Sequence, residues 1–166
     1  MISSRDLILF INPPKYLSVL IAYTVAADVL PIFEKHFPKD LRPRKAVEAS
    51  KMYLDGYAVD AAAYVDAPSA HYAPSAHYAA VAVNAADAYA AANAAANAVY
   101  FTAKDSSEEH IFNLILSLLP QMIDYAVENQ VKLFTGSGDF SEIFEMLTDE
   151  QKKLVIYNMD VIGNWK

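Results

Sequence analysis

The chain has 166 residues, of which 55% are hydrophobic and 20% charged, so it can bury the core of one domain and is too apolar for a disordered protein. Its net charge of −7 disfavours direct nucleic-acid binding, which needs a positive face. The absence of cysteine excludes disulfides, a thiolate zinc site and a cysteine nucleophile, and it suits a cytoplasmic protein.

The first third of the sequence predicts helices that prolines separate. The expected helices cover residues 3–11, 14–26, 28–37 and 43–55. Asp28 is expected to cap the third helix, in which Pro31 would occupy the first turn, where proline is tolerated. The apolar face of that helix comprises Ile32, Phe33 and Phe37. The apolar segments 7–11 and 16–27 are shorter than the roughly 20 residues of a membrane-spanning helix, so we expect no membrane contact.

Alanine dominates residues 58–103 and makes this the most informative stretch of the chain. Alanine is the strongest helix former, and its small side chain lets neighbouring helices approach closely. We therefore expect a buried central helix from about residue 75 to residue 102, preceded by an exact duplication, Ala67–Tyr72 and Ala73–Tyr78. Three tyrosines spaced by eleven residues, about three helical turns, should share one stripe of this helix: Tyr78, Tyr89 and Tyr100.

The last third of the sequence continues the helical pattern. The expected helices cover residues 108–128, 140–147 and 150–159. Pro120 should kink the first of them, because proline removes a backbone hydrogen bond. Thr148 and Gln151 have the spacing of a capping box, which predicts the start of the last helix.

The predicted fold class is all-α. No window of alternating β-branched residues is bounded by hairpin turns, so no strand is expected. We expect a single-domain helical bundle over residues 1–166, with about seven or eight helices and the alanine-rich helix buried at its centre.

Patterns for catalysis, metals and cofactors are missing from the sequence. The four histidines are His36, His71, His77 and His110. None of them forms a pair three or four residues apart, as a helical zinc site requires. The four glycines form no nucleophile elbow, phosphate-binding loop or dinucleotide-binding motif. We therefore expect a non-enzymatic protein without catalytic residues, metal or cofactor.

Polar residues within the alanine-rich helix are candidates for a binding surface. They are Asn84, Asp87, Asn93 and Asn97. Buried polar side chains need hydrogen-bond partners, so the first interpretation is a set of interhelical hydrogen bonds that fix the helix register. The second interpretation is a tyrosine-lined groove in which Asn93, Asn97 and Tyr89 contact a partner, since tyrosine is enriched at interfaces.

A basic cluster at residues 39–45 supplies two further candidates for partner binding, Arg42 and Arg44. Both lie near a helix start, where the helix dipole disfavours positive charge, so we expect carboxylates beside them. Glu34, Glu48 or a C-terminal carboxylate would form an internal salt bridge. A carboxylate of a partner protein is the alternative.

The residues around this cluster resemble the opening of the Imm-5-like immunity proteins of bacteria. The similarity consists of Val29–Glu34, Pro38, Asp40, Arg42–Ala49 and Gly56, and it extends in character over residues 25–105. The resemblance implies a cytoplasmic protein that binds and neutralises a polymorphic toxin, without catalytic residues. The chain departs from the family by the duplication and by asparagine and tyrosine in the alanine-rich helix, where relatives usually have arginine or histidine.

The expected function is therefore that of a toxin-binding immunity protein with a protein partner, the cognate toxin or effector. We expect neither direct nucleic-acid binding nor membrane contact, and a homo-oligomer stays open. One alternative is an acidic inhibitor, of phage or host origin, that blocks a nucleic-acid-binding effector by charge mimicry. Another is a small-molecule-binding protein with a tyrosine-lined cavity between helices.

Overall fold

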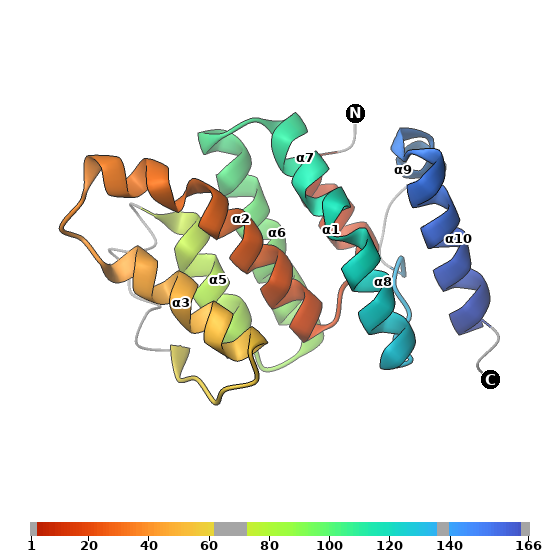
Figure 1. Ribbon diagram of the computed structural model, residues 1–166, viewed down its shortest axis with the longest axis horizontal. Coiled ribbons are helices and arrows are strands. Elements are labelled where there is room, and N and C mark those ends of the chain that lie inside the picture. Colours follow the sequence, from red (N-terminus) through yellow and green to blue (C-terminus); the bar gives the residue numbers. More distant parts are fainter. Residues whose placement is uncertain (1–2, 62–72, 136–139, 164–166) are drawn as a thin grey trace.

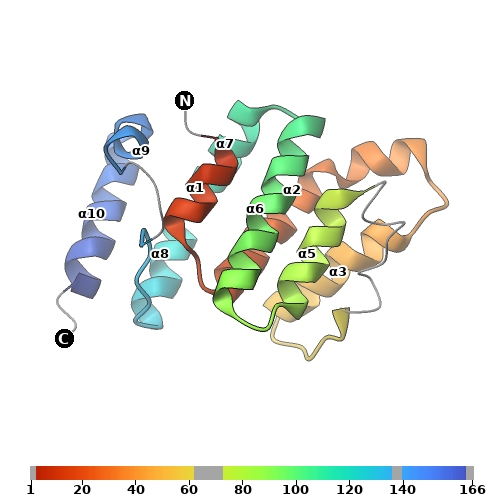
Figure 2. The same cartoon turned by 180° about the vertical axis from the view of Figure 1, so that it is seen from behind.

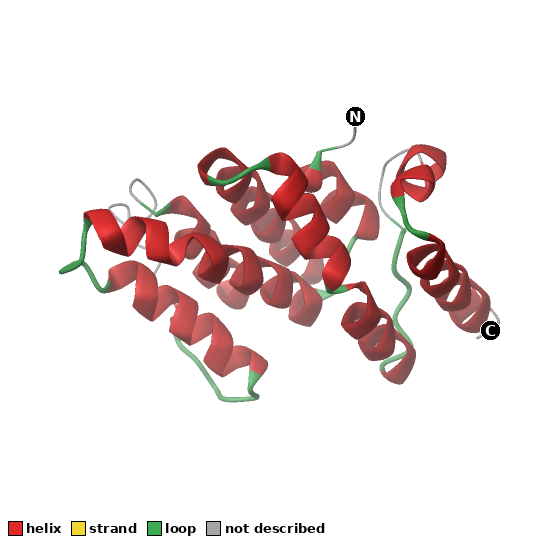
Figure 3. Ribbon diagram, turned by 45° about the horizontal axis from the view of Figure 1, so that its top comes forward, coloured by secondary structure: helices red, strands yellow, loops and turns green. Residues whose placement is uncertain are grey.

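The computed structural model describes residues 3–61, 73–135 and 140–163, and the secondary-structure elements of these ranges are α-helices (Figures 1 and 3). The helices are α1 (Ser4–Ile11), α2 (Lys15–His36), α3 (Arg42–Leu54), α5 (Pro74–Asn84), α6 (Ala88–Asp105), α7 (Glu108–Ser117), α8 (Leu119–Glu128), α9 (Phe140–Met146) and α10 (Asp149–Gly163). The prediction of an all-α helical bundle is confirmed. Helices α7 and α8 are the two halves of the expected long helix, broken where Pro120 occupies the first turn of α8.

Helix α2 lies at the centre of the fold. It packs against α5 and α6 on one side and contacts α3 and α7. Figure 2 shows α1, α6 and α5 side by side in front of α2, so these three helices form one layer. Helix α10 packs on α8 at the opposite end of the molecule from α3 (Figure 1). The core is the set of buried aliphatic and alanine side chains where these layers meet.

Helix α2 is longer than the sequence predicts. The helices expected at 14–26 and 28–37 are one helix of 22 residues, and Pro31 lies inside it instead of in a first turn. An interior proline costs about 3 kcal/mol or more, since it removes one backbone hydrogen bond and crowds the preceding turn. Leu30 and Phe33, on either side of Pro31, pack against the core and offset this cost, because full burial of such a side chain contributes about 1.5–3 kcal/mol.

The alanine-rich region forms two helices, not the single long helix predicted. The helix breaks after Asn84, and Asp87 starts α6 by accepting a hydrogen bond from the Ala90 amide at 2.8 Å. Helices α5 and α6 then pack on each other and on α2 through buried alanines. The alanine-rich element is thus buried as expected, but as a helical hairpin. The first copy of the duplication lies outside the described residues, and the second leads into α5.

The break separates the three tyrosines that were expected on one stripe. Tyr78 lies on α5 and stacks on Phe101 of α6, with ring centroids 5.6 Å apart and an interplanar angle of 9°. Tyr89 and Tyr100 stay together on the outward side of α6. The prediction of a common stripe is therefore wrong for Tyr78 alone.

The last helices follow their sequence signals. Thr148 and Gln151 form the predicted capping box, with the Thr148 amide donating to Gln151 Oε1 at 2.9 Å and the Gln151 amide to Thr148 Oγ1 at 3.3 Å. Val155 of α10 is buried where this helix packs on α8. The C-terminal residues that could have held the expected carboxylate partner for Arg42 or Arg44 lie in part outside the described ranges.

Two helical segments, Lys15–His36 and Glu108–Glu128, are long and apolar enough to cross a membrane by length and composition. The sequence did not predict a first segment of this length because it placed a helix boundary before Pro31. In the fold, 50% and 44% of their most apolar windows are buried, as happens in the core helices of soluble proteins. Length and composition alone are therefore weak evidence for a membrane span.

The close approach of α6 to its neighbours leads to a paired prediction. Ala95→Leu inserts three heavy atoms at a fully buried position and should lower the free energy of unfolding by about 1–3 kcal/mol, because a well-packed core does not accept extra volume. Ala90→Leu makes the same change at an exposed position of the same helix and should change stability by less than about 0.5 kcal/mol. Chemical denaturation of both variants measures the difference. Equal effects would contradict close alanine packing.

Candidate functional site

The turn between α2 and α3, with the helix ends on either side of it (residues 31–45), forms what we call the α2–α3 corner. Two arginine–carboxylate pairs hold it. Arg44 Nε and Nη2 donate to Glu34 Oε1 and Oε2, both at 2.7 Å, and so join the start of α3 to the end of α2. Arg42 Nε and Nη2 donate to Asp40 Oδ1 and Oδ2 at 2.9 and 2.6 Å. The predicted salt bridge to Glu34 is thus confirmed for Arg44, while Arg42 pairs with Asp40.

These carboxylates offset the unfavourable position of two cations in the first turn of a helix. Asp40 Oδ1 also accepts a hydrogen bond from the Arg42 amide at 3.1 Å, so Asp40 pairs with both the backbone and the side chain of the first residue of α3. Hydrogen bonding from Arg42 lowers the pKa of Asp40 from 3.8 to about 2. The hydrogen bonds that Arg44 donates to the Glu34 carboxylate raise the pKa of Arg44 above its ordinary value. The corner is held by charge-assisted hydrogen bonds at the protein surface.

Apolar side chains of the same corner are exposed to solvent. Ile32, Phe37 and Leu41 keep 47%, 48% and 52% of their surface exposed. Ile32 and Phe37 line a hollow of about 180 Å³ between the end of α2, the start of α5 and Asp105 at the end of α6. The sequence predicted Ile32, Phe33 and Phe37 as the apolar face of a helix, but it did not identify the exposed part of that face as a surface feature. The signal for it was the position of these residues beside Pro31, Pro38 and a run of charges.

A second surface runs along α6 on the side that faces away from α2. We call it the α6 stripe; its residues are Tyr89, Asn93, Asn97, Tyr100 and Lys104. Tyr89 is 76% exposed and Tyr100 44% exposed. The amide nitrogen of Asn93 donates to the Tyr89 carbonyl oxygen of its own helix at 3.0 Å, and Lys104 Nζ lies 4.4 Å from the Tyr100 ring centroid. The interpretation of Asn93 as an interhelical hydrogen-bonding group is therefore wrong.

The five predicted partner-binding residues fall into two groups that the structure does not bring together. Arg42 and Arg44 lie on α3, at the corner. Tyr89, Asn93 and Asn97 lie on α6, and α5 packs between these two helices (Figure 2). Each group therefore belongs to its own surface, and their role in binding a partner stays a prediction.

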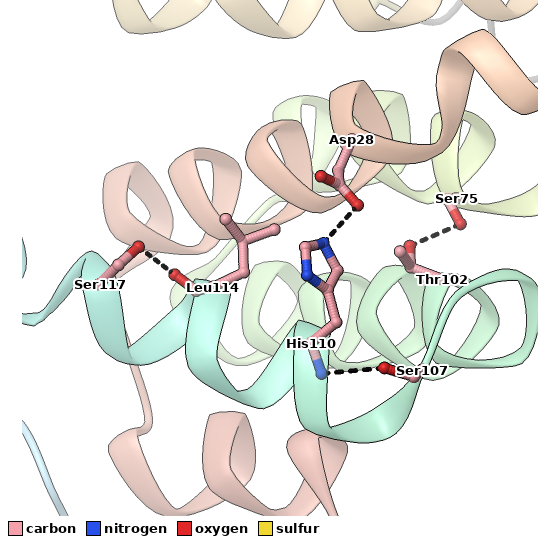
Figure 4. A network of polar contacts seen from close by, with 7 residues as sticks. All are labelled: Asp28, Ser75, Thr102, Ser107, His110, Leu114 and Ser117. Atoms are coloured by element: carbon pink, nitrogen blue, oxygen red, sulfur yellow. Dashed lines mark hydrogen bonds and ion pairs between the residues drawn. The ribbon is translucent and has the colours of Figure 1, made fainter.

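Figure 4 shows the polar contacts that join α2, α5, α6 and α7 in the interior and at its edge. The buried Thr102 hydroxyl lies 2.8 Å from both Ser75 Oγ and the Ala98 carbonyl oxygen. His110 Nε2 lies 3.0 Å from Asp28 Oδ2, so Asp28 links α2 to α7 instead of capping a helix. Each of these groups has a structural partner, and the network orients helices of the core.

The remaining histidines lie apart from one another. His36 is exposed at the end of α2, with Nδ1 2.9 Å from the Ile32 carbonyl oxygen, and His77 lies on α5. His71 lies outside the described residues. Within the described ranges no three His, Asp or Glu side chains are grouped so that they could hold a metal ion. The absence of a metal site in the whole chain stays a prediction.

Comparisons with known proteins add no relative to this description. No family model, no curated protein and no solved structure matches the chain.

The Arg42–Asp40 pair predicts how stability depends on pH. The pKa of Asp40 is lower in the folded state, about 2 against 3.8, so the pair stabilises the fold fully above about pH 4 and loses this effect as the pH falls through 2. Arg42→Gln should raise the pKa of Asp40 towards 3.8, and its effect on unfolding should stay below about 1 kcal/mol because the pair is exposed. NMR titration of the carboxyl groups measures the pKa.

Lys45→Gln is the control for this experiment. It removes a positive charge from the exposed side of the same helix and contacts neither oxygen of Asp40 in any described hydrogen bond. We expect the pKa of Asp40 to stay near 2 in this variant. A wild-type pKa near 3.8, or an equal shift in both variants, would show that Arg42 does not hold the Asp40 carboxylate.

Proposed function

We propose that this protein is a non-enzymatic immunity protein that binds and neutralises a bacterial toxin, and that the α2–α3 corner contacts the toxin. One observation carries the proposal: the half-exposed Ile32 and Phe37 border a hollow that is lined in part by residues of Val29–Phe33, and these residues belong to a segment that resembles the Imm-5-like immunity proteins. Exposed apolar residues beside a hollow are typical of protein-binding surfaces, since a partner can insert an anchor side chain there and exclude water.

The charge of the corner supports a partner with an acidic surface. Residues 34–48 contain five Lys or Arg residues against three Asp or Glu residues, although the whole chain carries −7. A basic patch in an acidic protein attracts an acidic partner and repels most basic ones. A toxin surface with a projecting apolar side chain surrounded by carboxylates fits both the hollow and its rim.

Arg42 and Arg44 shape this surface through their internal pairs. The Arg42 guanidinium already pairs with Asp40, and the Arg44 guanidinium already pairs with Glu34. Both arginine side chains keep close to half of their surface exposed, so a toxin carboxylate would share them instead of finding them unpaired. We therefore assign them a positioning role and place most of the binding energy on the apolar residues.

The alternative functions fit this corner less well. An inhibitor that mimics nucleic acid would present an acidic surface, whereas the corner is basic. A small-molecule site lined by tyrosine would differ from the hollow, whose lining is aliphatic and phenylalanine side chains of α2 together with the start of α5. High salt would weaken binding in both the toxin and the mimicry proposals, so substitution of apolar residues separates them better than salt does.

The test uses the toxin encoded beside the gene for this protein, because immunity genes lie next to the genes of their toxins. Ile32→Asp should weaken binding of the toxin domain at least tenfold, because a carboxylate cannot be buried in an apolar contact without a partner. Ile156→Asp on α10 is the matched control: Ile156 is also a helical isoleucine with 47% of its surface exposed. Isothermal titration measures the affinity, and survival of toxin-expressing cells measures protection.

The control variant should bind and protect like the wild type. Equal loss in the two variants, or full protection by Ile32→Asp, would place the toxin-binding surface away from the corner. A neighbouring gene product that the wild-type protein neither binds nor inhibits would contradict the proposed function itself.

A further inference from the structure

The hollow at the α2–α3 corner has the size of one aromatic ring. Its volume is about 180 Å³, and most of its lining is apolar side chains at the end of α2 and the start of α5. An apolar cavity of about 150 Å³ can hold a benzene ring, so a ring with one or two further heavy atoms fits this hollow. The half-exposed Ile32 and Phe37 lie on its edge, so an occupant can enter from the surface of a partner.

Two phenylalanines of the lining are placed to contact such a ring. The centroids of Phe33 and Phe37 lie 5.0 Å apart, with an interplanar angle of 30°. Phe33 packs against the core, whereas Phe37 keeps 48% of its surface exposed. Aromatic rings attract one another at centroid distances of 4.5–7 Å beyond the gain from buried area. A third ring beside this pair therefore binds better than an aliphatic side chain of similar size.

A histidine in the lining offers a hydrogen-bond acceptor. Nδ1 of His36 lies 2.9 Å from the carbonyl oxygen of Ile32, one turn earlier on α2. A carbonyl oxygen only accepts, so this contact places the proton of the neutral imidazole on Nδ1 and leaves Nε2 as an acceptor. Nε2 of His36 has no hydrogen-bond partner among the residues that the structure describes.

A carboxylate supplies the second acceptor. Asp105 lines the hollow as the last residue of α6, where the helix dipole disfavours a negative charge. Within the described ranges its carboxylate makes no hydrogen bond or ion pair. A hydrogen-bond donor of an occupant would therefore meet an acceptor that is charged and not already paired, which is the stronger kind of hydrogen bond.

These features together select the chemistry of the occupant. Both polar groups accept, so the occupant must donate. A cationic donor is disfavoured because residues 34–48 carry five Lys or Arg residues against three Asp or Glu residues. An aliphatic side chain fits the walls but leaves the two acceptors without a donor, which costs affinity. A phenol combines a ring for the walls with one neutral O–H donor.

We propose that the hollow binds one phenol ring, and that the side chain by which the toxin is anchored at the α2–α3 corner is a tyrosine. Its ring lies against Phe33 and Phe37, and its hydroxyl donates to the Asp105 carboxylate or to His36 Nε2. The identification of the toxin's anchor rests on the proposed function, whereas the affinity of the hollow for a phenol does not.

Titration of the full chain with p-cresol, the side chain of tyrosine, tests the hollow without a toxin. Toluene is the matched probe, because it has the same ring and methyl group but no hydroxyl. We expect p-cresol to shift the NMR signals of the Val29 and Ile32 methyl groups and of the Ser75 amide, with about millimolar affinity. Toluene should shift the same signals and bind at least threefold more weakly, because it leaves the acceptors unpaired.

Substitution of the two acceptors tests the origin of this preference. The double variant His36→Leu with Asp105→Leu should bind the two probes equally, and its unchanged affinity for toluene would show that the hollow is intact. Asp124→Leu removes a carboxylate from an exposed position of α8 and should keep the preference for p-cresol. Equal affinities of the wild type for the two probes, no shift of the hollow's signals, or an undiminished preference in the double variant would overturn the proposal.

The toxin domain encoded by the neighbouring gene tests the anchor. Replacing its surface tyrosines one at a time by phenylalanine removes only a hydroxyl, and at one position this should weaken binding at least tenfold. If no tyrosine matters while Ile32→Asp still abolishes binding, the tyrosine anchor is wrong and the corner remains the toxin-binding surface. If the toxin is not bound while p-cresol is preferred to toluene, the proposed function is wrong and the assignment of the hollow is supported.

Discussion

Close contact between methyl-sized side chains of α2, α5 and α6 is the constraint on which this fold depends. An alanine contributes little buried area, so a helix that packs through alanines gains stability only if its backbone comes close to its neighbours and makes many short contacts. Ala79, Ala95 and Ala98 meet that condition, since all three are fully buried. The shape of the layer that contains α1, α6 and α5 follows from this close approach.

The same constraint sorts side chains by size. Every residue longer than alanine on the buried face of α6 must fit a narrow space, and only Val99 and Thr102 do so. Thr102 has its hydroxyl satisfied within the core by Ser75 and the Ala98 carbonyl oxygen. The tyrosines, asparagines and lysine of this helix are accordingly outside. A scaffold of this kind keeps its recognition chemistry on the surface, where long side chains project from a rigid backbone.

Comparison of the structure with the sequence shows which features local sequence signals predict and why they do not predict the others. Local signals succeeded where one or two turns decide the outcome: the kink at Pro120, the capping box of Thr148 and Gln151, and the pairing of Arg44 with Glu34. They failed where packing opposes local preference. Helix α2 continues through Pro31, where Leu30 and Phe33 on either side of the proline pack against the core, and no local rule weighs that packing against one lost hydrogen bond.

The prediction of one long helix in the alanine-rich region was wrong for the opposite reason. Most residues there favour a helix, so propensity does not say where the helix should turn back. The break at Asn84–Asp87 lets α5 and α6 pack on each other and both pack on α2, which is a tertiary gain. The interfacial role suspected for Tyr89, Asn93 and Asn97 depended on their facing outward. Tertiary packing decides which side of an alanine-rich helix faces solvent, so the sequence alone does not predict it. The α2–α3 corner was not predicted for the same reason, because its exposure also depends on how the helices pack.

The two surfaces are separate in the fold. The α2–α3 corner is built from the ends of α2 and α3, and the α6 stripe lies beyond α5, so an occupant of one does not cover the other. The arginine pairs that hold the corner are exposed, and an exposed ion pair contributes little to stability. The corner can therefore stay basic, as recognition of an acidic partner requires, without a large cost to the fold.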